Sequence, residues 1–434
     1  MVQAYWREAL HDEAVFSLFV RRLPDERAFL LACGLDDALR FLEDLRFHPE
    51  TLDYLASRPE FEQPFVDWLA DLRFRGEVRA MPEGTPLFAN EPILEVRASL
   101  PQAQLAETIL MNQVQLQTML ASKAARVVLA ARGRAVVDFG LRRMHGVDAG
   151  LKAARAFHIA GVAATSNVLA GKIYGIPVTG TMAHSYVQAH ASELDAFRAF
   201  ARQYPETTLL VDTYDTLEGV RTVVRLAEEL GDDFAVSAVR LDSGDLAALA
   251  IQARRILDDA GLAAVRIFAS GGLDEDEIEA LLTREAPIDG FGVGTSMGVS
   301  SDAPALDIAY KLAEYAGRAR LKLSSDKPIQ PGSKQVFRVE EAGVAVRDII
   351  ARADESLPGR PLLEPVMRRG RRLPAGKVEL EAARAYAAER IASLPDRLRG
   401  IGPPEPAYPV EVSPRLRELQ RTTALEVAGS VDAQ

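Results

Sequence analysis

The sequence predicts an α/β protein with an irregular parallel α/β barrel core and a smaller α+β domain formed from the N- and C-terminal segments. In the middle of the chain, short runs of β-forming residues alternate with helical segments at intervals of about 25 to 40 residues, the pattern of parallel βαβ units. Helices and Pro/Gly-punctuated strands replace this alternation on either side. The expected divisions are an N-terminal domain at 1–115, the barrel core at 116–320, and a C-terminal segment at 321–434 that packs back on the N-terminal domain.

The composition is that of an ordinary compact protein, and it excludes some classes of partner. The chain has 434 residues, of which 48% are hydrophobic and 26% charged. Its net charge of -11 opposes general attraction to nucleic acid or to an anionic membrane surface, so any bound anion needs a local site. The single cysteine excludes an intrachain disulfide, and we expect a cytoplasmic protein.

The first 75 residues are expected to form amphipathic helices, because apolar and charged positions alternate at helical spacing in stretches such as LDDALRFLEDLRF. From about Phe74 to Leu100, Pro and Gly interrupt short alternating runs, which predicts small antiparallel strands. A helix should follow from about Gln102 to Ala131, since that span contains no Gly or Pro.

Six apolar runs in the middle of the chain are the expected strands of the barrel. They are AVVDFG (135–140), GIPVTGT (175–181), TLLVDTYD (208–215), VSAVRLDSGD (236–245), VRIFASGG (265–272) and IDGFGVGT (288–295). Polar residues collect at the carboxyl end of each run, so one functional face is expected, as in barrel enzymes. After about residue 320, strands and loops return, as in KPIQPGSKQVFRVEEAGVAVRDII, and the last twenty or so residues are expected to be a loose tail.

Two of these runs end in glycine-rich segments, ASGG at 269–272 and GVGT at 292–295. Glycine lets backbone N–H groups approach an anion, so two such ends on successive strands favour a phosphate site over plain tight turns. The chain contains no GxxxxGK[ST] loop, so ATP would have to bind in another arrangement. The candidate phosphate-binding residues are Gly271, Gly272, Gly294 and Thr295.

Acidic residues end two other runs, in VDTYDT and RLDSGDL. Asp212 and Asp242 are placed to hold Mg²⁺ on a pyrophosphate or to accept hydrogen bonds from ribose hydroxyls. For Asp215 and Asp245, capping of the following helix is an equally good interpretation. Arg240 follows the apolar VSAV, and a guanidinium directed from a barrel strand toward the mouth calls for an anionic ligand.

The segment DFGLRR at 138–143 offers a flat ring, Phe139, and two guanidinium groups for a carboxylate or phosphate, Arg142 and Arg143. Core packing and a solvated basic turn explain the same residues, although their place at a strand end favours function. In GTMAHSYVQAH, His190 is interpreted as structural, whereas His184 follows a Gly-Thr strand end where a nucleophilic imidazole faces bound phosphates.

Taken together, these motifs resemble one family, the nicotinate phosphoribosyltransferases. The matching runs are DFGLRRMHGVDAGLKAARAFHIAGVAATSNVLAG, GIPVTGTMAHSYV, RLDSGDL, ASGGLDE, DGFGVGTS, DAPALDIAYKL and PGSKQVFR, in family order, and AYWREALHDEAVFSLFVRRLP near the N-terminus also resembles the family. They cover about 135–340, and the combination is specific where SGG or GVGT alone is weak.

The resemblance implies an enzyme that forms nicotinate mononucleotide and pyrophosphate from nicotinate and phosphoribosyl pyrophosphate, with Mg²⁺ and with ATP as co-substrate. It implies that His184 takes a phosphoryl group, and that a homodimer with its active site near the interface is formed. The implied catalytic residues are His184, Asp212 and Asp242, the last two also as tentative Mg²⁺ ligands. The implied nicotinate-site residues are Phe139, Arg142, Thr181 and Arg240, with Arg240 on the carboxylate, and the implied cradle of the 5-phosphate is Gly271, Gly272, Gly294 and Thr295.

One difference from the family concerns the start of the chain. Members usually begin with a TDLYxLTM-like segment whose tyrosine stacks on the pyridine ring, often across a dimer interface. The present sequence starts with the Met of that segment. Either this Met lies downstream of the natural start, or the ring pocket is incomplete.

Four other interpretations stay open at this point. Quinolinate phosphoribosyltransferases resemble this fold but lack the phosphorylated histidine of GTMAHS, and nicotinamide phosphoribosyltransferases carry a DFGYRG-like run in place of DFGLRR. A type I phosphoribosyltransferase needs two adjacent acids before a phosphate loop, whereas Asp212 and Asp215 are separated by two residues. The fourth is a catalytically weak, structural homologue.

Overall fold

The chain forms two units, and the N- and C-terminal segments share one of them. The computed structural model describes residues 1–323 and 330–432. An α+β unit comprises residues 1–122 and 305–434, and a parallel α/β unit comprises residues 123–304. The α+β unit therefore contains more of the chain than the parallel unit, and the predicted order of sizes is wrong, because a second sheet of C-terminal strands adds to it.

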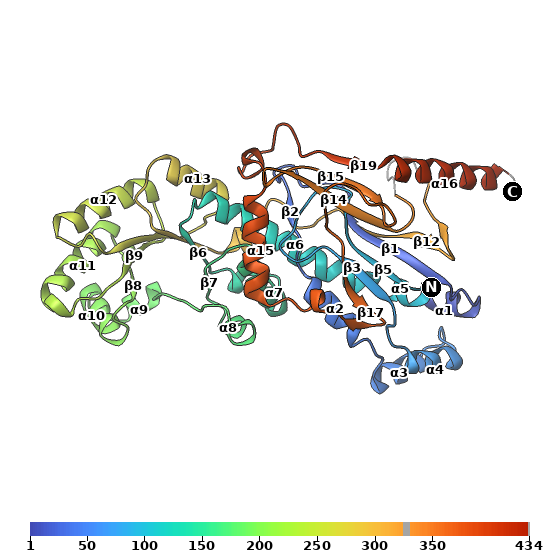
Figure 1. Cartoon of the computed structure of the whole chain (residues 1–434). Helices are drawn as coiled ribbons and strands as arrows, with labels where there is room; N and C mark the ends of the chain where they lie inside the picture. Colours follow the sequence, from blue (N-terminus) through green and yellow to red (C-terminus); the bar gives the residue numbers. More distant parts are fainter. Residues whose placement is uncertain (324–329, 433–434) are drawn as a thin grey trace. The chain divides into compact units, whose positions relative to one another are not determined.

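The α+β unit contains three antiparallel or mixed sheets (Figure 1). The seven-stranded sheet has the order β13-β12-β1-β5-β3-β17-β18, the four-stranded sheet the order β16-β14-β15-β19, and β2 pairs with β4. The strands are β1 (Glu13–Val20), β2 (Leu30–Leu31), β3 (Glu77–Ala80), β4 (Pro86–Leu87), β5 (Pro92–Ser99), β12 (Ile308–Tyr315), β13 (Arg318–Ala319), β14 (Lys334–Glu341), β15 (Val344–Arg352), β16 (Arg360–Pro361), β17 (Glu364–Arg368), β18 (Arg371–Arg372) and β19 (Val410–Val412).

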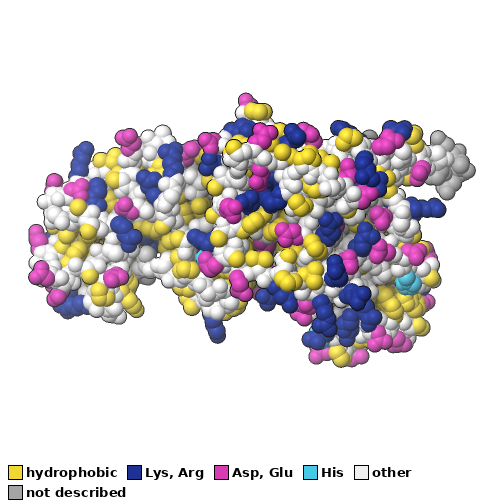
Figure 2. Space-filling view, in the orientation of Figure 1, with side chains coloured by type: hydrophobic (Ala, Val, Ile, Leu, Met, Phe, Trp, Pro, Cys, Tyr) yellow, Lys and Arg dark blue, Asp and Glu magenta, His cyan; other side chains and the backbone are white. Residues whose placement is uncertain are grey.

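Helices cover these sheets and connect them. They are α1 (Val2–Arg7), α2 (Leu35–Glu43), α3 (Pro49–Ala56), α4 (Gln63–Asp71), α5 (Leu100–Leu105), α15 (Leu380–Ala392) and α16 (Pro414–Asp432), and α6 (Glu107–Ala130) runs from this unit into the next. The predicted antiparallel strands before residue 100 and the long helix after it are confirmed. Figure 2 shows Lys and Arg side chains gathered over β17. Arg372 in β18 is paired with Asp36 and Glu43.

Two predictions for this unit are wrong, one of a helix near the N-terminus and one of a loose C-terminal tail. The stretch EAVFSLFV falls in the predicted helical region but forms β1, which pairs with both β12 and β5 and has seven of its eight residues buried. A short, nearly continuous apolar run fits a strand that is buried on both faces as well as it fits a helix. The predicted loose tail forms α16 as far as Asp432, and Leu416 of this helix is fully buried. The segment 324–329, part of the predicted strand-and-loop stretch, lies outside the described residues.

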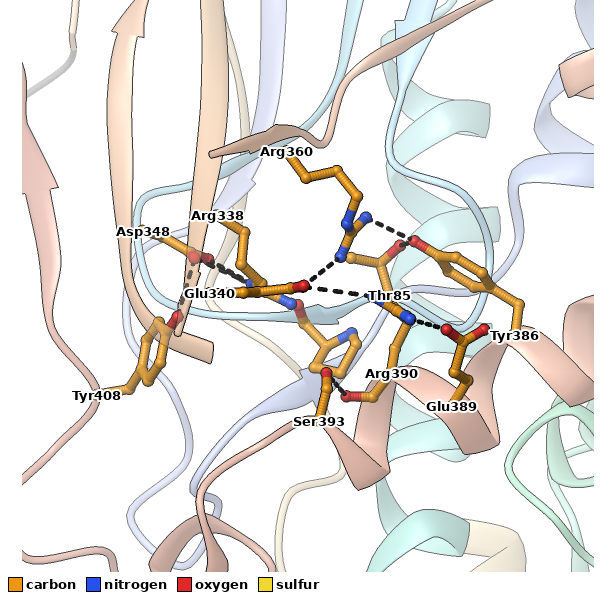
Figure 3. Close-up of polar contacts among 11 residues, drawn as sticks. Thr85, Arg338, Glu340, Asp348, Arg360, Tyr386, Glu389, Arg390, Ser393 and Tyr408 are labelled. Atoms are coloured by element: carbon orange, nitrogen blue, oxygen red, sulfur yellow. Dashed lines mark hydrogen bonds and ion pairs between the residues drawn. The ribbon is translucent and has the colours of Figure 1, made fainter. Parts of the chain in front are cut away.

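Charged side chains are also buried in the α+β unit, around β14 and β15 (Figure 3). Arg338 and Asp348 form an ion pair with no exposure to solvent, and the hydroxyl of Tyr408 donates to Asp348 at 3.0 Å. Nearby, the guanidinium groups of Arg360 and Arg390 both contact Glu340. A buried pair of this kind holds adjacent strands in register, since either partner left alone would be an uncompensated charge.

The parallel unit contains one six-stranded sheet of order β7-β6-β11-β10-β9-β8, and every neighbouring pair in it is parallel. Its strands are β6 (Ala135–Asp138), β7 (Ala164–Thr165), β8 (Thr208–Leu210), β9 (Ala238–Leu241), β10 (Arg266–Ala269) and β11 (Gly290–Val293). Its helices are α7 (Val147–Ile159), α8 (Val168–Tyr174), α9 (His184–Gln188), α10 (Glu193–Gln203), α11 (Thr216–Leu230), α12 (Leu246–Asp259), α13 (Glu275–Thr283) and α14 (Thr295–Val299), with a short 3₁₀ helix η1 (Leu141–Arg143). The predicted parallel barrel core is confirmed in the form of a half-barrel (Figure 1).

Five of the six predicted barrel strands are present, and one is not. The run GIPVTGT contributes only an isolated bridge between Val178 and Thr165, and the strand next to β6 is instead the short β7. Glycine and proline within that run weaken its β-sheet character. In the part of the chain that the structure describes, no helix combines the length and apolar character needed to cross a membrane.

Candidate active site

The carboxyl ends of four parallel strands converge on one pocket of about 250 Å³. Because parallel strands all point the same way, the residues that follow β6, β9, β10 and β11 meet at one edge of the sheet. The pocket is lined by Phe139, Arg142, Arg143, Arg240, Asp242, Ser270, Gly271, Gly272, Leu273, Gly292, Gly294 and Thr295. Eight of the eleven predicted site residues are in this set, and the other three, Thr181, His184 and Asp212, contact its members.

The glycine-rich strand ends lie side by side in the pocket, and backbone geometry requires glycine at one of them. Gly271 has a φ of +97°, and a Cβ atom there would lie 1.9 Å from the carbonyl oxygen of Asp242. Thr295 begins α14, and its hydroxyl accepts a hydrogen bond from Arg143 at 3.1 Å. Backbone N–H groups and a guanidinium therefore share one wall, which suits a phosphate.

Arg240 is held by hydrogen bonds from all three of its guanidinium nitrogens. Nε donates to Ser270 Oγ at 2.7 Å, Nη1 to Thr181 Oγ1 at 2.7 Å, and Nη2 to Asp242 Oδ1 at 2.6 Å. Its side chain is 14% exposed, and its guanidinium carbon lies 5.4 Å from the centre of the Phe139 ring. A fixed fork of N–H groups beside an aromatic face can receive a planar ring that bears a carboxylate.

Asp242 connects Arg240 to His184 through its two carboxylate oxygens. Oδ1 accepts from Arg240 and from Ser270, and Oδ2 lies 3.9 Å from Nε2 of His184. Burial alone would raise the pKa of Asp242, but the hydrogen bonds from Ser270 and Arg240 and the charge of Arg240 outweigh it and bring the pKa below its usual value. Asp242 is therefore a carboxylate at neutral pH.

His184 is the first residue of α9, and its side chain is 43% exposed. Nδ1 lies 3.2 Å from Thr213 Oγ1, while Nε2 faces Asp242. The ring is thus held on one side by a hydroxyl and on the other by a carboxylate, and it stays open to solvent. This arrangement leaves the ring accessible, and the predicted phosphoryl transfer to it stays a prediction.

Asp212 has one carboxylate oxygen in use and one free. Oδ2 accepts hydrogen bonds from Ser243 Oγ at 2.6 Å and from the Asp242 backbone at 3.3 Å, whereas Oδ1 has no hydrogen-bond partner among the described residues. Within residues 1–323 and 330–432, no group of three or more His, Cys, Asp or Glu side chains is arranged to hold a metal ion. A Mg²⁺ at this site would therefore depend on one or two carboxylates and the phosphates of its substrate.

Asp215 and Asp245, for which the sequence left both capping and ligand binding open, are helix caps. Asp215 accepts from the backbone N–H of Glu218 at the start of α11, and Asp245 accepts from that of Ala248 at the start of α12. Asp245 also pairs with the exposed Arg284. Capping rather than ligand binding therefore explains both residues.

Sequence reasoning did not single out three side chains that shape the site. The hydroxyl of Ser270 contacts both Arg240 and Asp242, and Thr213 contacts His184. The buried carboxylate of Asp138, the last residue of β6, accepts from the backbone N–H of Gly140 and from Thr165 Oγ1. Burial raises the pKa of Asp138, although these two hydrogen bonds oppose the rise. In the sequence, only their position next to predicted site residues pointed to Ser270, Thr213 and Asp138.

Comparison with known proteins identifies the family of this chain. The N-terminal domain model of nicotinate phosphoribosyltransferase matches residues 1–115, and the family model of nicotinate phosphoribosyltransferase matches residues 134–338. Together the two matches cover more than half of the chain and include every predicted site residue.

Curated relatives and solved structures extend the match over nearly the whole chain. Nicotinate phosphoribosyltransferase pncB2 of Mycobacterium tuberculosis is 55% identical over 429 residues, covering 99% of this chain and 93% of the relative. Nicotinate phosphoribosyltransferase of Bacillus subtilis is 43% identical, covering 78% of this chain and 71% of the relative. The crystal structure of human nicotinic acid phosphoribosyltransferase is similar with a TM-score of 0.85 and 29% identity, over 97% of this chain and 98% of that one. The chain therefore belongs to the nicotinate phosphoribosyltransferase family, and the enzyme class that its motifs predict is confirmed.

Proposed function

We propose that this enzyme joins nicotinate to the ribose 5-phosphate unit of phosphoribosyl pyrophosphate, giving nicotinate mononucleotide and pyrophosphate for NAD synthesis, and that it couples this reaction to ATP hydrolysis through a phosphohistidine at His184. The observation that carries the proposal is the connection between two sites. His184 faces one oxygen of Asp242, and the other oxygen of Asp242 is bonded to Arg240, which stands beside Phe139.

Each predicted site residue has a place in this reaction. The carboxylate of nicotinate pairs with Arg240, its ring lies against Phe139 with Arg142 beside it, and Thr181 holds Arg240 from the other side. The 5-phosphate lies against the glycine-rich wall formed by Gly271, Gly272, Gly294 and Thr295. Backbone N–H groups and a nearby guanidinium are strong donors to phosphate oxygens.

In the transfer step, the pyridine nitrogen forms a bond to C1′ of the ribose while the bond from C1′ to the pyrophosphate oxygen breaks. Positive charge develops on the sugar, and the carboxylates of Asp212 and Asp242 stabilise it. In the coupling step, a ring nitrogen of His184 bonds to the γ-phosphorus of ATP and ADP leaves, and water later hydrolyses the phosphohistidine to release phosphate.

Magnesium fits this site best at Asp212. Among the described residues, the buried Oδ1 of Asp212 has no hydrogen-bond partner, whereas Oδ1 of Asp242 is bonded to Arg240 and Ser270. When bound, Mg²⁺ would neutralise charge on the leaving pyrophosphate or on the phosphates of ATP. Asp242 is then the carboxylate that acts on the histidine and the ribose.

A homodimer is part of the proposal, and the parallel unit offers a surface for it. On α8 and just after it, four large apolar side chains are between 47% and 70% exposed, namely Val168, Leu169, Ile173 and Val178. Contiguous apolar side chains on a protein surface mark sites of association. Replacing Leu169 and Ile173 by Asp should shift the mass measured by sedimentation from dimer to monomer, and a monomeric parent enzyme would contradict this part of the proposal. A cytoplasmic location fits both co-substrates and the buried thiol of Cys33, which forms no disulfide.

The central test is the substitution of His184→Ala, with His190→Ala as the matched control. His190 lies in the same segment, but its ring packs on Tyr186 and bonds to the Tyr186 carbonyl oxygen. We expect the first variant to lose ATP-stimulated turnover and ³²P labelling from γ-labelled ATP while it retains its fold. The control should keep both. Undiminished coupling in His184→Ala would contradict the phosphohistidine.

A substrate scan separates this proposal from the related activities. Turnover is measured with nicotinate, nicotinamide and quinolinate at equal concentration, with phosphoribosyl pyrophosphate and ATP present. Because Arg240 offers only N–H donors, the acid is expected to be preferred over the amide. Preference for nicotinamide or quinolinate would overturn the assignment, and absence of turnover with every substrate would indicate a structural homologue.

A further inference from the structure

The hydroxyl of Ser270 is the point where the hydrogen bonds around Arg240 and Asp242 join. It accepts from Arg240 Nε at 2.7 Å and donates to Asp242 Oδ1 at 2.5 Å, while Arg240 Nη2 bonds directly to the same Oδ1 at 2.6 Å. The three groups form a closed ring of hydrogen bonds. Ser270 lines the pocket but is only 2% exposed, and its hydroxyl is engaged by Arg240 and Asp242.

This ring fixes the direction of two side chains that serve different steps. The hydrogen bond from Nε to Ser270 fixes the orientation of the Arg240 guanidinium plane, so the remaining N–H groups of Arg240 point in one direction. With Oδ1 of Asp242 tied to both neighbours, Oδ2 is left facing His184 at 3.9 Å. One buried hydroxyl thus orients a group of the nicotinate pocket and a group of the phosphorylation site.

We propose that Ser270 is a positioning residue that holds Arg240 in the orientation that receives the nicotinate carboxylate and, through Asp242, fixes the carboxylate oxygen that faces His184. The inference rests on the proposed function, in particular on the nicotinate role of Arg240. It assigns to Ser270 a role separate from that of the adjacent glycines, which form the phosphate wall.

The hydrogen-bond pattern predicts which substrate constants depend on Ser270. In Ser270→Ala, Arg240 keeps its bonds to Asp242 and Thr181 but loses the bond that fixes its plane. We expect the KM for nicotinate to rise about tenfold, equivalent to about 1.4 kcal/mol. The KM for phosphoribosyl pyrophosphate should stay unchanged, and the stimulation of turnover by ATP should fall severalfold.

The experiment compares Ser270→Ala with Ser270→Thr and with Ser237→Ala. The threonine keeps the hydroxyl and should restore the KM for nicotinate to within about threefold of the parent enzyme, a difference of less than about 0.7 kcal/mol. Ser237 also donates to two acceptors in the same unit, the carbonyl oxygens of Glu206 and Thr207, but contacts no side chain of the site. Its alanine variant should leave all three measurements unchanged.

Arg240→Ala and the double variant Ser270→Ala/Arg240→Ala complete the test. If Ser270 acts on nicotinate through Arg240, its loss should not raise the KM for nicotinate further once Arg240 is gone. An unchanged KM in Ser270→Ala, with a raised KM in Arg240→Ala, would overturn the role of Ser270 alone. A rise confined to phosphoribosyl pyrophosphate would make Ser270 a phosphate ligand and overturn it as well. An unchanged KM for nicotinate in Arg240→Ala would instead overturn the proposed nicotinate pocket.

Discussion

Arg338 and Asp348 in the α+β unit form the same kind of ion pair as Arg240 and Asp242 in the parallel unit, but only the second pair has an edge open to a pocket. In the first, Arg338 donates from Nε and Nη2 to both oxygens of Asp348, and neither side chain is exposed (Figure 3). In the second, only one oxygen of Asp242 is bonded to Arg240, and both side chains are partly exposed.

The surroundings of the two pairs also differ. Arg338 lies beside Phe88 and Tyr408, whose rings stack on each other, and also donates to the carbonyl oxygen of Pro86, so it joins strands from distant parts of the chain. The guanidinium of Arg240 lies beside the ring of Phe139, and both side chains line the pocket. The comparison teaches that the same pair of residues stabilises a fold when it is enclosed and recognises a ligand when one edge is left free.

The largest effect that separates the two pairs is on stability. Arg338→Met would leave Asp348 as a buried charge without its partner, and we expect the free energy of unfolding to fall by about 3 to 5 kcal/mol. The matched variant Arg240→Met leaves a partly exposed carboxylate and should cost no more than about 1 kcal/mol. Urea denaturation followed by circular dichroism measures both. Equal loss in the two variants would show that enclosure does not distinguish the pairs.

The fold of the parallel unit was predictable from the sequence to a greater extent than that of the α+β unit. Parallel strands are specified by short apolar runs separated by helices, and each of β6, β8, β9, β10 and β11 lies inside a predicted run. In the α+β unit, β1 gains its burial from β12, which is almost three hundred residues away in the chain. No local pattern reports that partner, so the apolar run alone does not distinguish a strand from a helix.

The site shows the same limit at the level of side chains. Strand ends located the residues of the pocket, because parallel topology brings them to one edge. Whether a neighbouring acid caps a helix or faces a ligand depends on its final direction, so the sequence left both interpretations open for Asp215 and Asp245. Ser270 was missed because a buried hydroxyl acquires its role from two partners on another strand.

The second prediction concerns ligand binding, where Arg240→Met should have a larger effect than Arg338→Met. Arg240→Met should raise the KM for nicotinate by about 30- to 100-fold, since a hydrogen-bonded charge pair contributes roughly 2 to 3 kcal/mol. Arg338→Met, assayed at a temperature where it is folded, should leave this KM within about twofold, because a shift that small is worth less than about 0.5 kcal/mol. Steady-state kinetics at saturating phosphoribosyl pyrophosphate checks both. A comparable rise in both variants would mean that nicotinate does not pair with Arg240.

The smallest effect concerns Glu91, which lies fully buried next to the enclosed pair. Burial raises the pKa of Glu91 well above its usual value, and the negative charge of Asp348 adds to the rise. In the unfolded chain this carboxyl ionises near pH 4.5. Above that pH the folded state therefore binds one more proton than the unfolded state, and the contribution of Glu91 to stability falls as the pH rises toward its folded pKa.

Glu91→Gln should remove this fall, because an amide keeps the acceptor for the Phe88 N–H and has no proton to lose. Relative to the parent enzyme, the variant is expected to gain stability between pH 5 and pH 8, by about 1 kcal/mol or more at the upper end. The control is Glu95→Gln in β5, which breaks the buried ion pair with Lys334 and should destabilise at every pH in this range. The test measures the free energy of unfolding of the parent enzyme and of the variants at four pH values. If this free energy changes with pH in the same way in Glu91→Gln as in the parent enzyme, Glu91 is ionised beside Asp348 and the prediction is wrong.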